Sequence, residues 1–201
     1  MTRFSKKLYD TVAIVGMSTL LLASCSRDGR EMQAPTADQT ETIAVASTIA
    51  EFITPVQELS IAAPWQDGAP LDSQFTCEGS KLSPSFNLAG LPEGTVTWGL
   101  SIVDQTAGNA AHWVAANIDP AINSVDAGVA PTGAVQSLNR VNKVGYAAPC
   151  PKVGEPHTYL LTVYAVSQQL EVTDGMDSET MLTSLEAGSL GITSITFTVT
   201  R

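Results

Sequence analysis

The fold is set by residues 92–103, which read PEGTVTWGLSIV. After the turn-forming residues 92–94, apolar side chains at 96, 98, 100 and 102 alternate with Thr, Gly, Ser and Val at 97, 99, 101 and 103. This period of two predicts a β-strand. Residues 195–200, which read ITFTVT, alternate in the same way, and residues 157–166 form a third run that is rich in β-branched and aromatic side chains.

One helix is indicated near the C-terminus. Asp177 is placed to cap it, Met181, Leu182 and Leu185 share one face, and Gly188 is placed to end it. Many short strands, turns rich in Gly and Pro, and one late helix predict a mainly β protein, a β-sandwich with one or two peripheral helices. Residues 55–201 have the length of one domain, and a domain of about 150 residues buries close to 70% of its unfolded surface.

The N-terminus has the pattern of a bacterial lipoprotein signal. Arg3, Lys6 and Lys7 precede an apolar stretch at residues 11–22 that is too short to span a membrane. The stretch ends in residues 22–25, LASC, which resemble the lipobox, in which the cysteine is acylated and becomes the mature N-terminus. We therefore expect a signal peptide at residues 1–24 and a lipidated Cys25; a plain secretory signal is the alternative.

These features place the protein in a bacterial cell envelope. Ser26 after the cysteine favours the outer membrane, facing the periplasm. Residues 25–54 are rich in Ala, Thr, Asp, Glu and Gln, and they are predicted to form a flexible linker with a reach of roughly 30 Å. The more apolar residues 43–53 leave room for a short helix or an added strand there.

The charge of the chain argues against nucleic-acid binding. Ten Lys and Arg face twenty Asp and Glu. Loss of residues 1–24 would remove three of the basic and one of the acidic residues, which leaves a net charge of −12. An acidic surface repels phosphate backbones.

The three cysteines suggest one disulfide. If Cys25 is acylated, Cys77 and Cys150 remain as an even pair in an oxidising compartment, which favours a bond between them. Two buried free thiols are the alternative. The spacing is not that of a zinc site, and no metal or other cofactor is indicated.

His112 and His157 are the only histidines, and each begins a predicted strand beside a polar turn. We expect them to converge on one site. Imidazole is a ready hydrogen-bond donor to anions near neutral pH.

Five motifs in collinear order resemble the phosphatidylethanolamine-binding proteins, in particular the bacterial branch described as Raf-kinase-inhibitor-like. The resemblance covers residues 59–201. Residues 75–84 (FTCEGSKLSP) are similar to the family's "TCDG…SP" opening, residues 90–95 (GLPEGT) to its glycine–proline turn, and Asp104 to the first Asp of "DPDxP". Residues 112–118 (HWVAANI) match "HWxxxNI", and residues 145–159 (GYAAPCPKVGEPHTY) match "GYxGPxPPxGxxHRY".

The resemblance implies a Greek-key β-sandwich with a small pocket that binds anions, typically the phosphate of phosphoethanolamine or of another phosphorylated group. Carried over residue by residue, the pocket includes Asp104, His112, Pro149, His157 and Tyr159, with backbone at its rim from Ala148 and Cys150. Imidazole, phenol and amide groups would donate to the phosphate, while Asp104 holds one histidine in its tautomer.

This sequence also departs from the family pattern. Thr106 replaces the second Asp of "DPDxP", which removes a carboxylate from the pocket, and Gln105, Ala147, Lys152 and Thr158 replace other motif residues.

Catalysis has little support in the sequence. It lacks a Gly-x-Ser-x-Gly elbow, a phosphate-cradling glycine loop and a histidine-rich metal motif. Two non-enzymatic functions remain. One is a lipid-anchored module that binds a phosphorylated headgroup or small anion. The other is a protein-interaction module, analogous to family members that inhibit kinases or proteases, in which the pocket is vestigial or regulatory.

Overall fold

The computed structural model describes residues 58–201. The signal peptide, the acylated Cys25 and the flexible linker predicted for residues 1–54 lie outside the described residues, as does the extra element considered at residues 43–53. Within residues 58–201, no helix is both long enough and apolar enough to cross a membrane.

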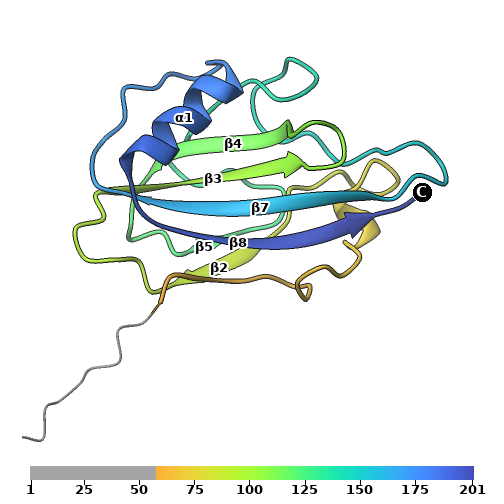
Figure 1. Cartoon of the computed structure of the whole chain (residues 1–201), viewed down its shortest axis with the longest axis horizontal. Helices are drawn as coiled ribbons and strands as arrows, with labels where there is room; N and C mark the ends of the chain where they lie inside the picture. The colour runs from red at the N-terminus through yellow and green to blue at the C-terminus, as the bar shows by residue number, and fades with distance from the viewer. Residues whose placement is uncertain (1–57) are drawn as a thin grey trace, which may run out of the picture. The chain divides into compact units, whose positions relative to one another are not determined.

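Two antiparallel sheets form a sandwich (Figure 1). The larger sheet has the strand order β6-β4-β3-β7-β8 and the smaller the order β1-β2-β5. The strands are β1 (Ser60–Ala62), β2 (Phe86–Ala89), β3 (Thr97–Asp104), β4 (Ala110–Ile118), β5 (Ser124–Val125), β6 (Val135–Gln136), β7 (His157–Val166) and β8 (Ser189–Val199). The 3-10 helix η1 (Ser73–Phe75) and the α-helix α1 (Ser178–Gly188) complete the domain, which confirms the mainly β prediction.

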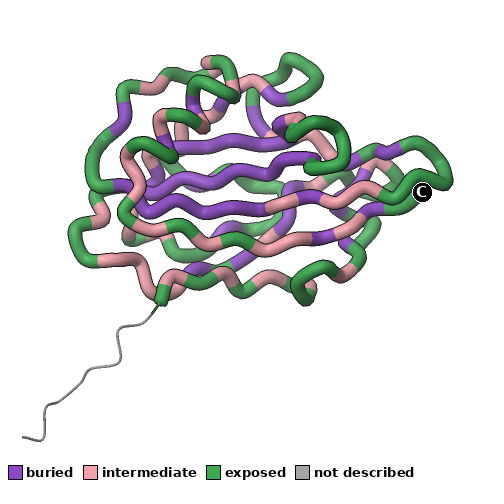
Figure 2. Tube along the Cα trace, viewed as in Figure 1, coloured by how far each residue is buried: buried purple, intermediate pink, exposed green. Residues whose placement is uncertain are grey.

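Strand β3, whose alternation predicted a strand, is buried on both faces (Figure 2). Trp98, Leu100 and Ile102 belong to the core between the two sheets. The small and polar residues of the other phase lie on the side of α1, where a Cβ on Gly99 would overlap Leu185 of the helix. The alternation in the sequence therefore separates two buried faces, and neither face is open to solvent.

The predicted helix is present as α1. The Asp177 side chain accepts a hydrogen bond from the Thr180 amide, which is the N-cap arrangement. Met181 and Leu185 are fully buried, and the helix ends at Gly188, where a Cβ would lie 3.0 Å from Val166 Cγ1. A glycine therefore lets the end of α1 approach the sheet closely.

The predicted disulfide between Cys77 and Cys150 is also present, with a Cα–Cα distance of 5.3 Å. It joins the loop after η1 to the loop that precedes β7. The Cys77 amide donates to the Pro149 carbonyl at 3.0 Å, so a backbone hydrogen bond reinforces the same junction.

Strand pairing gathers the motif residues at one end of the larger sheet. β3 lies between β4 and β7, and its last residue, Asp104, is paired with Ala110 of β4 and with Tyr159 of β7. His157, the first residue of β7, is paired with Val199 near the end of β8. The end of β3 and the beginnings of β4 and β7 therefore meet.

Candidate functional site

Asp104 is the centre of the site. Its side chain is almost completely buried, and its two oxygens have different partners. Oδ1 accepts from the backbone amides of Thr106 and Ala107, each at 3.0 Å, which closes the turn between β3 and β4. Oδ2 is 2.7 Å from His157 Nδ1. The carboxylate thus fixes a turn and a histidine together.

The contact with Asp104 determines the tautomer of His157. An ionised carboxylate only accepts hydrogen bonds, so Nδ1 carries the proton and donates to Oδ2. In the neutral ring, Nε2 is then a bare acceptor. The His157 side chain is 17% exposed, so it connects the buried cluster to solvent.

His112 is held in the same tautomer by a different partner. Its Nδ1 is 2.7 Å from the Ala147 carbonyl, which also only accepts, so Nδ1 is the donor. Its Nε2 is buried and has no hydrogen-bond partner among the described residues. Asp104 Oδ2 lies 4.0 Å from this nitrogen, which is too far for a direct hydrogen bond.

Tyr159 packs the site against the core. Its ring stacks on Phe197 with the ring centroids 5.2 Å apart, and it meets the His112 ring edge-on at 5.1 Å. Burial, followed by the negative charge of Asp104, raises the pKa of the Tyr159 phenol above its ordinary value. The phenol therefore stays protonated.

The pKa values of Asp104 and His112 are both lowered, but for different reasons. Burial alone would raise the pKa of Asp104, but hydrogen bonding with His157, Tyr159 and the Ala107 amide outweighs burial and lowers it. Burial lowers the pKa of His112, because desolvation disfavours the imidazolium form, and the opposing hydrogen bond to Ala147 does not compensate. The interior of the site thus favours a carboxylate beside a neutral imidazole.

These tautomers restrict what the site offers to a ligand. The Nε2 atoms are the free imidazole nitrogens, and each is an acceptor while its ring is neutral. Donation from Nε2 to an anion requires the imidazolium form. Proton uptake is therefore part of any anion binding through these two rings.

The loop between β6 and β7 contributes mainly backbone. Ala147, a residue at which the chain departs from the family pattern, provides the carbonyl that holds His112, and its amide donates to the His112 carbonyl at 2.8 Å. The Pro149 carbonyl is occupied by the Cys77 amide, Ala148 is half-buried, and Cys150 is in the disulfide.

Thr106 has a structural role in place of the missing carboxylate. Its amide donates to Asp104, and its hydroxyl accepts from the Thr158 amide at 2.9 Å. Thr106 thus ties the β3–β4 turn to β7.

The cluster is compact in this structure. Cavities of about 180 to 580 Å³ indent the described surface, and five of these are lined by residues other than Asp104, His112, His157 and Tyr159. No three His, Cys, Asp or Glu side chains within residues 58–201 are placed to hold a metal ion.

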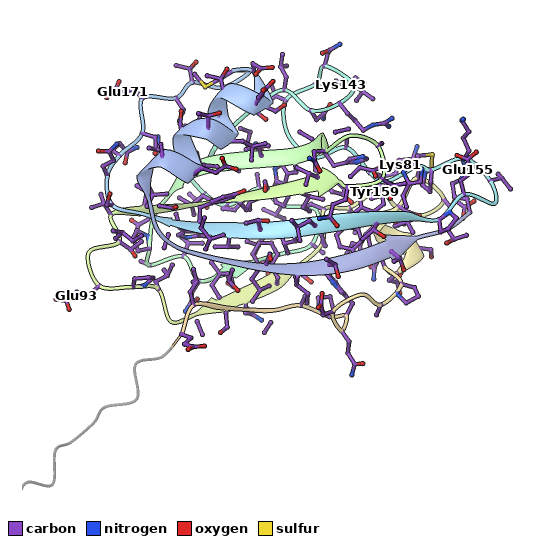
Figure 3. All side chains as sticks on the ribbon, in the orientation of Figure 1. Lys81, Glu93, Lys143, Glu155, Tyr159 and Glu171 are labelled. Atoms are coloured by element: carbon purple, nitrogen blue, oxygen red, sulfur yellow. A yellow bond between two sulfur atoms is a disulfide. The ribbon has the colours of Figure 1, made fainter. Side chains whose placement is uncertain are left out.

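Sequence reasoning missed Arg140 as a feature of the site. Its amide donates to the carbonyl of Ala111, the residue before His112, at 2.7 Å. A signal was present in the charge pattern, because the five Lys and Arg of residues 58–201 occur at 81, between 140 and 152, and at 201. Figure 3 places Lys81, Lys143 and Glu155 at the same end of the molecule as Tyr159, and Glu93 and Glu171 at the other end.

Comparison with known proteins identifies the family. Residues 62–200 match the family model described as phosphatidylethanolamine-binding protein. The chain therefore belongs to the phosphatidylethanolamine-binding protein family, as the motifs suggested.

Three similar proteins illustrate the range of relatives. A UPF0098 protein of Methanothermobacter thermautotrophicus is 33% identical over 134 residues, which cover 63% of this chain and 88% of the relative. The putative lipoprotein LppC of Mycobacterium tuberculosis is 32% identical over 123 residues, which cover 59% of this chain and 61% of LppC. The crystal structure of Escherichia coli YbcL, described as a new member of the mammalian PEBP family, matches with a TM-score of 0.67 at 25% identity, covering 72% of this chain and 99% of that structure.

Proposed function

We propose that this member of the phosphatidylethanolamine-binding protein family is a lipid-anchored, non-catalytic protein of the bacterial envelope that binds a phosphorylated headgroup or another small anion. The binding residues are Asp104, His112, His157 and Tyr159, beside the backbone of residues 147–150. The observation that carries this proposal is the buried His112 Nε2, which has no hydrogen-bond partner among the described residues.

An unpartnered buried nitrogen is costly. Leaving such a group without a hydrogen bond costs about 1 to 3 kcal/mol, and native proteins seldom retain one without a reason. The unpartnered atom lies beside a carboxylate and a second histidine, and His157 gives the group contact with solvent. A ligand that supplies a partner to Nε2 would recover this cost on binding.

Anion binding at this site is coupled to protons. The Nε2 of His112 becomes a donor when its ring is protonated, so affinity for a phosphate group should rise as the pH falls through the lowered pKa of His112. Asp104, whose pKa is lowered, remains ionised over this range. At still lower pH the affinity should fall again, because a protonated Asp104 no longer holds His157 through a charge-assisted hydrogen bond and because the ligand loses charge.

An NMR titration of the full-length protein in detergent micelles with inorganic phosphate and with phosphoethanolamine tests the proposal. The resonances of Asp104, His112, His157 and Tyr159 should shift at millimolar ligand, and more at pH 6 than at pH 8. His157→Ala should weaken binding roughly 10- to 100-fold, as expected for one charge-assisted hydrogen bond. Thr158→Ala changes the next side chain, which points to the opposite face of β7, and should leave the affinity unchanged. The anion-binding proposal is wrong if neither ligand shifts these resonances in the folded protein.

The lipid anchor rests on the lipobox at residues 22–25 and on the similarity to a putative lipoprotein. Cys25→Ser should release the protein from the membrane fraction, because the tether then carries no acyl chains. Intact mass of the membrane-bound protein should show the added chains. Equal membrane retention of the variant and the wild type would rule the anchor out.

A protein-interaction function is the second candidate, and the loop before β7 favours it. Val153 in this loop is 76% exposed, and Val141 and Val144, earlier in the same loop, are each 51% exposed. Exposed valines at the end that carries the site suit contact with another protein. Native mass spectrometry of the protein extracted from its own envelope separates the two functions, since it detects either a retained small ligand or a bound protein.

A further inference from the structure

We infer that Arg140 is the principal anion-contacting residue of this site and that its guanidinium supplies the fixed positive charge for a phosphomonoester dianion. The inference rests on the proposed function, because it assigns the group that makes anion binding feasible near neutral pH. The site needs a positive charge of this kind. The ionised Asp104 lies beside a His112 whose burial favours the neutral ring, and the negative charge of Asp104 repels a phosphate.

The structure holds Arg140 firmly next to His112. Its amide donates to the Ala111 carbonyl at 2.7 Å, and the preceding residue, Asn139, is buried. Asn139 Nδ2 donates to the Gly145 carbonyl at 2.9 Å, and its Oδ1 accepts from the amides of Val141 at 3.0 Å and Lys143 at 3.2 Å. One buried amide side chain thus fixes the backbone turn that presents Arg140.

The same loop returns to His112 at its other end. The Ala147 amide donates to the His112 carbonyl at 2.8 Å, and His112 Nδ1 donates to the Ala147 carbonyl at 2.7 Å. The loop from Arg140 to Ala147 is therefore bonded at both ends to adjacent residues of β4. The backbone of Arg140 is therefore held beside His112 before any ligand arrives.

The charge of Arg140 reaches the two buried rings of the site. Burial is the main cause of the lowered pKa of His112, and the positive charge of Arg140 lowers it further. Burial raises the pKa of Tyr159, and Arg140 opposes that rise. The charged and titratable groups around His112 are thus Asp104 on β3, His157 and Tyr159 on β7, and Arg140 on the loop.

Arg140 is also free to bind. Within residues 58–201, Lys152 pairs with Glu155 at 3.9 Å and Arg201 with Glu78 at 3.2 Å, whereas Arg140, which is exposed, has no ion-pair partner. A guanidinium matches two oxygens of a phosphate group through parallel N–H donors, which a lysine cannot do. Inorganic phosphate and a headgroup phosphate share this chemistry.

Calorimetric titration of the full-length protein in detergent micelles at pH 7.5 tests the inference. Arg140→Gln should weaken the binding of inorganic phosphate by about 10- to 100-fold. The matched control is Lys143→Gln, which removes one positive charge from the same loop and should change affinity by less than about 3-fold, as for an exposed charge in solvent. Arg140→Lys should be intermediate, because it keeps the charge and loses the fork. Phosphoethanolamine in place of phosphate distinguishes a headgroup from the free ion, since tighter binding of the amine-bearing ester favours a headgroup.

The pH dependence separates a direct contact from a structural role. Residual phosphate binding by Arg140→Gln should be stronger at pH 5.5 than at pH 7.5, because protonation of His112 then supplies a positive charge and an Nε2 donor. In the wild-type protein, the Arg140 Hε resonance should shift when phosphate is added, a measurement that needs no variant. Equal losses in Arg140→Gln and Lys143→Gln, or an unmoved Hε resonance in a protein that binds phosphate, overturn this inference and leave the proposed function standing. Failure of the wild type to bind either ligand overturns both.

Discussion

The substitution Asp104→Asn tests most directly how the polar cluster is held together. It keeps the size of the side chain and removes its charge. Asp104 is 3% exposed, so water cannot readily replace a lost partner. Its Oδ1 serves two backbone amides, and its Oδ2 serves His157.

The expected loss follows from counting acceptors. Asparagine has one carbonyl oxygen and one NH₂ group, so it cannot accept on both sides. If its oxygen stays with the amides of Thr106 and Ala107, its NH₂ group faces the His157 Nδ1 proton, and the charge-assisted bond is lost. A switch of the His157 tautomer would restore only a neutral hydrogen bond. We therefore expect a loss of about 1 to 3 kcal/mol in the free energy of unfolding at pH 7.

Urea unfolding at pH 7 and at pH 3 measures this effect, with Asp177→Asn as the control. Asn is as good an N-cap as Asp, so the control should change the stability little. Asp104 has a lowered pKa in the folded state, so its contribution is complete above the unfolded value near 3.9 and is lost as the pH falls through the folded value. The gap between wild type and Asp104→Asn should therefore narrow at pH 3. A variant that is as stable as the control at pH 7 would refute this account of the cluster.

Three further outcomes are expected. The Cys77–Cys150 disulfide closes a loop across a sequence separation of 73 residues, so its reduction should lower the free energy of unfolding by about 4 kcal/mol in the chain-entropy model. Urea midpoints with and without reductant measure this loss, and equal midpoints would contradict it. Gly99→Ala should cost about 1 to 3 kcal/mol, because the new Cβ would overlap Leu185 and lie 2.7 Å from the Ala115 carbonyl; wild-type stability would show that α1 can move away. Burial lowers the pKa of His112 in the folded state. The contribution of neutral His112 to stability is therefore complete above about pH 6.5, the unfolded pKa, and is lost as the pH falls through the folded pKa. A ¹³C-histidine titration that finds an unshifted pKa for His112 would contradict this.

The secondary structure could be predicted where local patterns determine it. Alternation identified β3 and β8, the run of β-branched and aromatic residues at 157–166 identified β7, and the cap at Asp177 with the apolar spacing after it identified α1. The burial of both faces of β3 could not be predicted. Gly99 lies on a face that would be exposed in an isolated sheet, and it is covered by a helix some eighty residues later in the chain. Such long-range packing leaves no periodic trace in the strand that it covers.

The sequence predicted that His112, His157 and Asp104 would lie together, but it did not predict which nitrogen of each imidazole ring is free. His112 and His157 each begin a strand, and Asp104 ends one, so antiparallel pairing brings them to the same edge. Which ring nitrogen is free depends on single contacts to Ala147 and Asp104 that no motif encodes. The meeting of these side chains could therefore be predicted from the sequence, whereas the free ring nitrogens follow only from the hydrogen bonds of the folded chain.

The described chain begins at the end of the larger sheet that is remote from the histidine site. A Cβ on Gly191, near the start of β8, would lie 3.8 Å from Leu59 Cδ2, whereas His157 is paired with Val199 near the end of the same strand. At about 3.3 Å per residue, the eight steps along the strand from Gly191 to Val199 span about 26 Å. Figure 1 shows the same arrangement, with the chain entering the domain at one end of the sheet and the C-terminus at the other. If Cys25 is acylated, the chain that carries the acyl groups therefore joins the domain at the end of the sheet that is remote from His157.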